Sequence, residues 1–364
     1  MTPSSLPRGD LSRHPTVLDV AEAAGVSRQT VSNVLNNPEV VKAKTRERVD
    51  QAIAALAYQP HASARRLRTR QSSTIGIRLD HQGDGISGGV LDRYLHALTE
   101  FAAARSMRIL LYTAADAQDE IRQFQRLLDG ADVDAFALTA THDGDPRTRW
   151  LREHGANFVT FGRPWGEDDI DDPVHRWVDV DGADGTSQAT EHLWSQGKRR
   201  IAYLGWPRTT GTDADRYRGW ERTMIQHGVP ASELEVLHWI SSEMVSDAQQ
   251  VVECKLAEVA EQAGTAESRS KGLARVDGIV CASDTLALGA LMAVRNAGRP
   301  EVPVVGFDNS SVALALGFSS VDQNLDDVGQ ASLELLLGPT AKGAGAEPTA
   351  AHRLIRPTLV VRHG

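Results

Sequence analysis

Apolar residues near the N-terminus recur every three or four positions, which predicts two short amphipathic helices. The positions that share one face are Leu18, Ala21 and Ala24 on the first helix and Val31, Val34 and Leu35 on the second. Thr16 and Asp19 form a capping-box pattern before the first helix. Gly25 permits a tight turn, and Ser27 can cap the second helix. Together these signals are typical of a helix-turn-helix motif.

A third helix is expected over residues 43–56, since Val49, Ile53 and Leu56 recur at helical spacing and can face the first two helices. Residues 1–15 are polar and rich in Pro and Ser, without periodicity, and are expected to form a disordered leader. The first folded domain is therefore expected to be a small all-α head of three helices.

From Thr74 onward, short apolar runs alternate with helical stretches, which predicts βαβ units and parallel sheets covered by helices. The expected strands are TIGI, RILLY, FAL, NFVTFG, WVDV, RIAYLGW, VDGIVCAS and VPVVGFDN, followed near the C-terminus by LIRPTLVV. About ten strands are too many for one small sheet. The fold class is thus a small all-α head joined to an α/β body over residues 74–364.

The chain has 364 residues, of which 41% are hydrophobic and 24% charged, an ordinary composition for a globular protein of two or three domains. Its net charge of −9 is unevenly distributed. Residues 1–72 contain 11 Lys and Arg against 6 Asp and Glu, a net charge of +5, whereas the remainder contains 28 against 42, a net charge of −14. A basic head beside an acidic body favours a small module that binds nucleic-acid phosphates.

The second helix carries polar side chains that can recognise DNA. The residues that face away from its apolar side are Arg28, Gln29, Ser32 and Asn33. Such side chains form hydrogen bonds with base edges in the major groove. The alternative is a helical hairpin that only packs on a core.

The sequence DVAEAAGVSRQTVSNVLN, followed by VKAKTRERVDQAIAALAYQP, strongly resembles the DNA-binding head of the lactose and galactose repressor family, LacI/GalR. The resemblance includes the third helix and the Tyr58-Gln59-Pro60 element at the family's spacing. It implies a helix-turn-helix DNA-binding domain over residues 16–60. The residues expected to bind operator DNA are Thr16, Ser27, Arg28, Gln29, Thr30, Ser32, Asn33, Tyr58, Ala64 and Leu67.

Residues 61–73 contain four arginines around Leu67, in a segment too short to form its own core or a stable isolated helix. The resemblance implies a hinge helix here, which orders on operator DNA when paired leucines wedge into the minor groove. Leu67 occupies the wedge position, and Ala64 lies one turn earlier. Apolar wedges that kink DNA, with arginines beside them on the phosphates, fit this role. The alternative is a solvated basic linker.

The segments TEHLWSQGKRRIAYLGW and GIVCASDTLALGALMAV resemble the body of the same family, though more loosely. The resemblance implies that residues 74–364 form an effector-binding and dimerisation domain with two parallel-sheet subdomains of the periplasmic-binding-protein type. The chain is expected to cross between them near Asp179, near Gln323 and after the segment GPTAKGAGAEPTAA. Tetrameric members carry an extra C-terminal leucine heptad helix, whereas this sequence ends after LIRPTLVV, so a homodimer is expected.

Polar residues directly after apolar runs are candidate ligand contacts, because ligands of parallel α/β sheets bind beyond the carboxyl ends of the strands. Asp284 matches the family's effector-binding aspartate, and Arg216 matches an arginine that clamps the effector. The alternatives are a helix cap for Asp284 and a surface ion pair for Arg216. Trp239 is expected either to stack on a sugar face or to belong to the core. The remaining candidates are Asp80, His81, Arg163, Asp308 and Gln323.

The sequence GDGISG contains G-x-G-x-x-G at Gly83, Gly85 and Gly88, which would suit a dinucleotide-binding enzyme. The first glycine does not follow the predicted strand directly, and RILLYT ends without an acidic residue for a ribose, so this alternative is disfavoured. No catalytic triad order or metal-ligand spacing is present, and Cys254 and Cys281 form no motif. Enzymatic activity, a cofactor and a metal are therefore not expected.

The sequence contains neither a secretion signal nor an apolar run of about eighteen residues, so a membrane span and secretion are not expected. A secreted sugar-binding protein would share the body fold but would not explain the head. The sequence predicts a cytoplasmic transcriptional repressor that binds a palindromic operator as a dimer. A small molecule, expected to be a sugar, binds the body and controls operator affinity.

Overall fold

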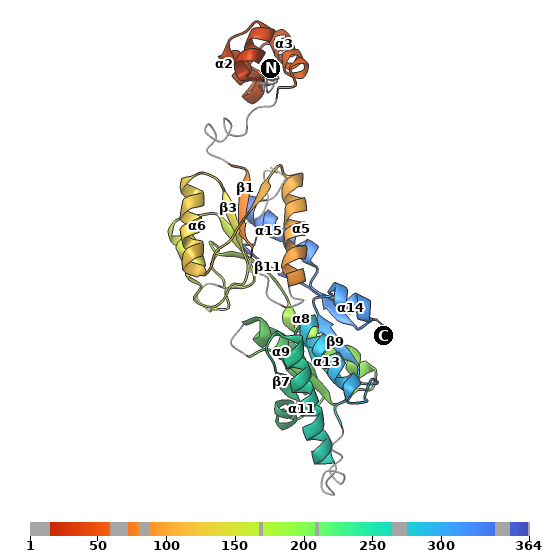
Figure 1. The fold of residues 1–364 in the computed structure, drawn as a ribbon. Helices are drawn as coiled ribbons and strands as arrows, with labels where there is room; N and C mark the ends of the chain where they lie inside the picture. Colours follow the sequence, from red (N-terminus) through yellow and green to blue (C-terminus); the bar gives the residue numbers. More distant parts are fainter. Residues whose placement is uncertain are drawn as a thin grey trace, which may run out of the picture. The chain divides into compact units, whose positions relative to one another are not determined.

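The structure is a computed structural model with two separate units. They divide between Ser72 and Ser73 into a helical head and an α/β body (Figure 1). The structure describes residues 15–58, 72–79, 88–166, 170–207, 211–263, 275–338 and 350–362. Most of the expected leader and hinge, including Ala64 and Leu67, lies outside the described residues.

The head is a three-helix unit with a small apolar core. Its elements are α1 (Val17–Ala24), α2 (Arg28–Asn36), the 3-10 helix η1 (Pro38–Val40) and α3 (Ala43–Ala55). Its core residues are Val20, Ala21, Ala24, Val31, Val34, Val49, Ala52 and Tyr58. The predicted helix-turn-helix and third helix are confirmed, because α1, α2 and α3 each contribute to this one core.

Local hydrogen bonds fix the turn between α1 and α2. Thr16 Oγ1 accepts a hydrogen bond from the Asp19 N–H, and the Asp19 carboxylate accepts one from the Thr16 N–H at 2.6 Å. Gly25 ends α1 at a φ of 59°, a left-handed conformation that favours glycine. Ser27 Oγ then caps α2 by accepting a hydrogen bond from the Thr30 N–H at 3.1 Å. The side chains of Thr16, Asp19 and Ser27 therefore cap the backbone of the two helices.

Three residues of the head lie elsewhere than the sequence pattern suggested. Leu18 is 61% exposed, because the short helix α1 buries the stripe that contains Val20 and Ala24 instead. Leu35, at the end of α2, is also exposed. Tyr58 was expected at the DNA, but its side chain is buried and belongs to the head's core.

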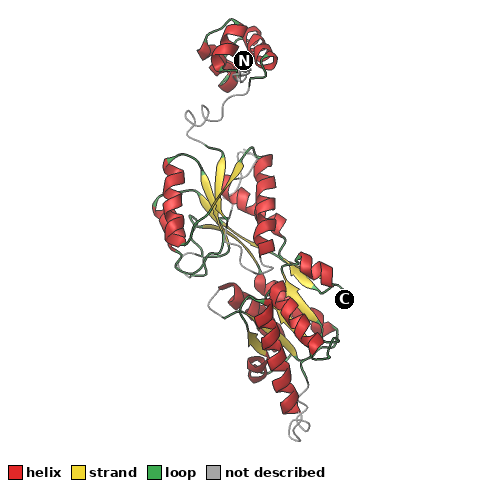
Figure 2. Cartoon of the chain, viewed as in Figure 1, coloured by secondary structure: helices red, strands yellow, loops and turns green. Residues whose placement is uncertain are grey.

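The body contains two six-stranded sheets, each covered by helices (Figure 2). The first sheet has the order β11-β5-β4-β3-β1-β2, and all its neighbouring strands are parallel. Its strands are β1 (Thr74–Arg78), β2 (Arg108–Tyr112), β3 (Ala135–Leu138), β4 (Phe158–Phe161), β5 (Arg176–Val180) and β11 (His352–Ile355). Its helices are α5 (Gly88–Ala104), α6 (Ala117–Asp129), α7 (Pro146–Glu153) and α15 (Leu325–Leu337). Helices α5 and α15 pack together on one face, and α6 lies on the other (Figure 1).

The second sheet has the order β12-β10-β9-β8-β6-β7. Its strands are β6 (Ile201–Gly205), β7 (His238–Ile240), β8 (Gly278–Cys281), β9 (Val304–Phe307), β10 (Ser320–Asp322) and β12 (Thr358–Val360). Its helices are α8 (Gly182–Ser195), α9 (Gly211–Gln226), α10 (Ala231–Leu237), α11 (Val245–Ala263), α13 (Asp284–Asn296) and α14 (Ser311–Leu316). Strand β12 pairs with β10 in the antiparallel direction, so the expectation of purely parallel sheets is wrong at this edge.

The eight internal apolar runs expected as strands all form strands. Most of them are buried between helices, whereas the edge strand β2 is buried only at Tyr112. LIRPTLVV, expected as one strand, is divided at Arg356-Pro357 between β11 of the first sheet and β12 of the second. Strands β7 and β10 were not expected from the sequence. Each has only three residues, too few for a recognisable apolar run.

The chain passes three times between the sheets, so each subdomain is discontinuous. It leaves the first sheet after β5, returns after β10, and crosses again between β11 and β12. These points lie close to Asp179, close to Gln323 and beyond the Gly- and Ala-rich segment, as the resemblance implied. The three crossings form the connection between the two subdomains.

Helices α8 and α9 approach closely at Gly219. A Cβ atom at this position would overlap the Ala183 carbonyl oxygen and the Thr186 hydroxyl. We therefore expect Gly219→Ala to lower the free energy of unfolding of the body by about 1–3 kcal/mol, measured by urea denaturation. Gly89→Ala is the matched control, because it lies on α5 with open space around its Cβ and gains helix propensity. Equal stabilities of the two variants would contradict this packing.

Candidate functional site

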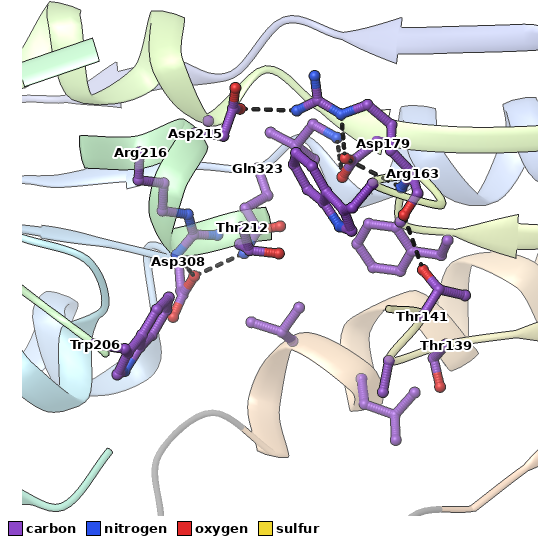
Figure 3. A pocket seen from close by; sticks show the side chains of 18 of the residues that line it. Thr139, Thr141, Arg163, Asp179, Trp206, Thr212, Asp215, Arg216, Asp308 and Gln323 are labelled. Carbon is purple, nitrogen blue, oxygen red and sulfur yellow. Dashed lines mark hydrogen bonds and ion pairs between the residues drawn. The ribbon is translucent and has the colours of Figure 1, made fainter. Parts of the chain in front are cut away.

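A cavity of about 400 Å³ lies between the two subdomains, at the carboxyl ends of both sheets (Figure 3). The first subdomain contributes Val90, Leu91, Thr139, Ala140, Thr141, Phe161, Gly162, Arg163, Trp165, Asp179 and Val180. The second contributes Trp206, Thr212, Asp215, Arg216, Glu243 and Asp308, with Gly182 and Gln323 from the crossings. This cleft combines apolar and aromatic walls with a few charged groups, which is typical of a small-molecule site.

Arg216 extends from α9 into the floor of the cleft. Its guanidinium lies 3.7 Å from the centre of the Phe307 ring and donates a hydrogen bond to the Ala282 carbonyl. Nη1 is 3.8 Å from Asp308 Oδ1. Nε is buried and has no hydrogen-bond partner among the described residues. The expected alternative of a surface ion pair is therefore wrong, since Arg216 is a buried cation with an unused donor.

Asp308 follows β9 directly and is held in an uncommon conformation. Its φ of 109° is rare for a residue other than glycine, and Gln323 Nε2 donates a hydrogen bond to its Oδ1 at 2.6 Å. Burial raises the pKa of the Asp308 carboxyl to about 7, although the Arg216 guanidinium opposes this shift. The negative charges of Asp284 and Glu243 add to the increase. Asp308 can therefore accept or donate a proton near neutral pH.

The raised pKa of Asp308 predicts a pH dependence of stability. Between its ordinary pKa of 3.8 and its folded pKa of about 7, the native state holds a proton that the unfolded state releases. Stability contributed by this proton is present below pH 4 and is lost as the pH rises through 7. Asp308→Asn should therefore gain stability relative to the wild type when urea denaturation is moved from pH 5 to pH 7.5. The control is Asp129→Asn, an exposed substitution on α6 of the same body. If the stability difference between Asp308→Asn and the wild type changed no more with pH than it does for this control, the assignment would be contradicted.

Arg163 joins the two subdomains across the cleft. It follows β4, and its Nε donates a hydrogen bond to Asp179 of β5 at 2.7 Å. Its Nη2 donates to Asp215 of α9 at 2.7 Å, as Figure 3 shows. Burial opposes the positive charge, but the charges of Asp179 and Asp215 raise the pKa of Arg163 overall. The guanidinium also lies 4.4 Å from the Trp165 ring, which packs against Gly211 of the other subdomain.

The exposed side of α2 forms the second candidate site. Arg28 and Gln29 are exposed in its first turn, and Asn33 lies partly exposed one turn later. Gln29 Nε2 donates a hydrogen bond to Asn33 Oδ1 at 3.2 Å, so these two side chains lie side by side. Thr16, Ser27 and Thr30 lie near the helix ends, where their hydroxyls cap the backbone or contact each other. Ser32 is partly exposed on the same helix.

Known proteins match both units of the chain. A family profile described as "Bacterial regulatory proteins, lacI family" matches residues 16–61, and one described as "Periplasmic binding protein-like domain" matches residues 190–364. The HTH-type transcriptional regulator CelR of Thermobifida fusca is 32% identical over 359 residues, which cover 96% of this chain and 98% of that protein. The chain belongs to the LacI family.

Two solved structures resemble this LacI-family protein over most of their length. A regulatory protein of the family from Chloroflexus aggregans has 27% identity and a TM-score of 0.67, covering 80% of this chain and 97% of that one. A CelR–cellobiose complex has 27% identity and a TM-score of 0.65, covering 96% and 99%. The protein is thus a DNA-binding transcriptional regulator and not an enzyme. The dinucleotide-enzyme and secreted-protein alternatives are both wrong.

Four of the eight expected effector residues of the LacI-family protein line the cleft: Arg163, Arg216, Asp308 and Gln323. Asp80 and His81 lie outside the described residues, as do Gly83 and Gly85 of the glycine motif. Trp239 and Asp284 do not line the cleft, so the effector contacts predicted for these two residues are wrong.

Trp239 belongs to the core of the second subdomain and not to the cleft. It is 1% exposed, and its Nε1 donates a hydrogen bond to the Val236 carbonyl. The side chains of a strand alternate between two faces, and Trp239 is the one residue of β7 that faces the core. The alternative that Trp239 belongs to the core is therefore correct, and stacking on a sugar face is not its role.

Asp284 is also fully buried outside the cleft. Its carboxylate accepts hydrogen bonds from the Ser320 hydroxyl at 2.6 Å and the Ser310 N–H at 2.7 Å. It thereby fastens β8 and α13 to the neighbouring β10 and α14. Ser283, not Asp284, caps α13, so the helix-cap alternative is wrong as well. The aspartates that line the cleft are instead Asp179, Asp215 and Asp308.

Several residues that line the cleft were not expected from the sequence. The same strand-end rule could have identified Thr139, Trp206 and Glu243, which follow β3, β6 and β7. Trp165 has no such signal, because it lies four residues beyond the end of β4, at a positive φ of 61°.

No group of three His, Cys, Asp or Glu side chains that could hold a metal occurs in the described part of the chain. Cys254 is exposed and Cys281 buried. None of the helices that the structure describes is long and apolar enough to cross a membrane.

Proposed function

We propose that this regulator is a cytoplasmic repressor that binds a palindromic operator as a homodimer, with an affinity set by a sugar in the cleft. The observation that carries the proposal is the lining of the cleft. Arg216, Asp308 and Gln323 offer donors and acceptors suited to ligand hydroxyls, and Trp165 and Trp206 offer aromatic surfaces suited to the apolar faces of a sugar ring.

A disaccharide is the first ligand to test. The cavity of about 400 Å³ lies within the usual size range of small-molecule sites. The related CelR has been solved in complex with cellobiose. Its similarity to this chain supports a sugar ligand here but does not specify which sugar.

Titration with a panel of neutral sugars, beginning with cellobiose and maltose, tests the proposal. We expect one sugar to raise the melting temperature of the protein and to change its affinity for operator DNA in a fluorescence anisotropy assay. Coupling of this kind commonly changes affinity by about 5- to 150-fold. If no sugar altered the melting temperature while a charged metabolite did, the sugar assignment would be wrong.

We also propose that Arg28, Gln29, Ser32 and Asn33 contact base edges, while Thr16, Ser27 and Thr30 lie near the phosphates. The exposed first turn of α2 supports this assignment, since recognition helices contact bases near their N-terminal ends. Two copies of such a helix in a symmetric dimer bind the two halves of a palindrome. Leu67 and Ala64 remain predicted minor-groove contacts.

Arg28→Ala is expected to relax the sequence preference at one position of each operator half-site. A bidentate arginine–guanine contact contributes about 1–3 kcal/mol of discrimination, and alanine removes it without disturbing the head's core. Selection from a random DNA library measures the preference. The control is Glu22→Ala, an exposed substitution on α1 that should leave the selected motif unchanged. An identical motif for wild type and Arg28→Ala would refute the assignment.

A further inference from the structure

A cluster of charged side chains is buried behind the cleft in the first subdomain. Arg147 and Glu120 are 3% and 1% exposed, and their Nη1 and Oε2 atoms lie 3.0 Å apart. Asp145 binds the other side of the same guanidinium, with Nη2–Oδ2 at 2.6 Å and Nε–Oδ1 at 3.0 Å. Arg78 Nη1 donates to Glu120 at 2.7 Å, and the Tyr112 hydroxyl donates at 3.1 Å. The cluster thus fastens the ends of β1 and β2 to α6 and α7.

Stability alone is a weak reason for this cluster. Charges removed from water lose their hydration, and buried ion pairs often add little compared with apolar side chains of similar volume. Burial opposes the charge of Arg147, but the hydrogen bonds and charge of Asp145, with those of Glu120, raise its pKa and keep it ionised. A permanently charged, fully paired arginine can hold its hydrogen-bond partners in one arrangement.

Two of those partners belong to the wall of the cleft. Arg147 Nη2 also donates hydrogen bonds to the carbonyl oxygens of Thr139 at 3.1 Å and Ala140 at 3.0 Å. Thr139, Ala140 and Thr141 line the cleft directly after β3. Ala140 has a φ of 53°, a left-handed conformation that is unfavourable for alanine. The two hydrogen bonds from Arg147 engage this backbone at and directly before the left-handed residue, where they can stabilise its conformation.

We propose that Arg147 is a positioning residue for the ligand site, which fixes the segment Thr139–Thr141 from behind. The inference rests on the proposed function in taking the cleft as the sugar site. Arg147 does not line the cleft itself and acts through the two carbonyls. The Thr141 hydroxyl in turn donates a hydrogen bond to the Arg163 carbonyl at 3.2 Å. The segment Thr139–Thr141 is therefore connected to Arg163, which joins the two subdomains.

The test combines Arg147→Lys with Ala140→Gly in a double-mutant cycle. Lysine keeps the charge beside Glu120 and Asp145 but cannot reach all the acceptors of a guanidinium. Glycine at position 140 removes the left-handed strain that Arg147 offsets. We expect Arg147→Lys to lower the urea midpoint of the body, and Ala140→Gly to recover a measurable part of that loss. Ala131→Gly is the matched control, because Ala131 is exposed with a φ of 49° but lies outside the cluster.

Ligand affinity supplies the second readout. With the sugar that binds the wild type, we expect Arg147→Lys to raise the dissociation constant at least about tenfold, and Ala140→Gly to restore part of it. Unliganded operator affinity should stay within about twofold. An additive stability cycle, identical for Ala140→Gly and Ala131→Gly, would overturn the inference. So would unchanged sugar affinity in Arg147→Lys. Failure of the wild type to bind any sugar would instead refute the proposed function, and the stability cycle would then decide the inference.

Discussion

Arg216→Met is expected to abolish the response to the sugar and to leave operator binding intact. Methionine keeps an unbranched stem against Phe307 but removes every donor directed at the cleft. Loss of one hydrogen bond to a charged group weakens binding by about 1.5–3 kcal/mol, about 10- to 150-fold in the dissociation constant. Asp308 is not left as an unpaired charge, because its pKa of about 7 lets it take up a proton.

Calorimetric titration of the sugar measures the affinity, and anisotropy of labelled operator measures DNA binding with and without it. Arg218→Met is the matched control. Arg218 lies two residues along α9, and its side chain is 62% exposed, paired with Asp215 at 3.1 Å. It should respond to the sugar almost as the wild type does. If Arg216→Met still responded at the wild-type sugar concentration, Arg216 would not belong to the effector site.

Val31→Asp is expected to unfold the head and eliminate specific operator binding while the body keeps its sugar affinity. Val31 is fully buried in a core of eight residues, and a carboxylate there has no partner among them. Burying an unpaired charge costs several kcal/mol, more than a domain of this size can tolerate. Because head and body are separate units, the melting transition of the body should not move.

Leu18→Asp serves as the control, since Leu18 belongs to the same head but is 61% exposed. An acidic residue in the first turn of α1 also interacts favourably with the helix dipole. We expect circular dichroism of the two single variants to show a folded head in Leu18→Asp and a loss of helix in Val31→Asp. A parallel loss of sugar binding in Val31→Asp would contradict the independence of the two units.

The fold of the head was predictable because its signals are local. The capping box at Thr16, the glycine at position 25 and the Ser27 cap each act within four residues of chain. The periodicity located the helices but not which face each would bury. Leu18 and Val20 both suit an apolar stripe, and only packing of α1 against α3 decided that Val20 is inside.

The sheets of the body were predictable where strands are buried on both faces, since such strands appear as continuous apolar runs. The short edge strand β7 and the strand β10 gave no such run. The antiparallel pairing of β12 depends on a chain reversal at Arg356-Pro357 and on which sheet lies beside it. These are contacts between residues far apart in the sequence, and no local pattern encodes them.

For the cleft, the sequence determined which residues lie near the carboxyl ends of strands, and this rule located Arg163, Asp308 and Gln323. The sequence did not determine whether each of these side chains points into the cleft or away from it. Asp284 occupies an equivalent strand end, yet the serines of β10 and the loop before α14 engage its carboxylate away from the cleft.

The sequence by itself thus determined the family, the helix-turn-helix head, most strands of the two sheets and several of the residues that line the cleft. Tertiary structure decided which of those side chains meet. Trp165 and Asp179 contact Arg163 within the first subdomain, but Asp215 reaches it only after the chain has crossed to the second. The physical reason is that helix caps and apolar periodicity act over a few residues. The walls of the cleft instead depend on packing and charge pairing between segments brought together by the completed fold.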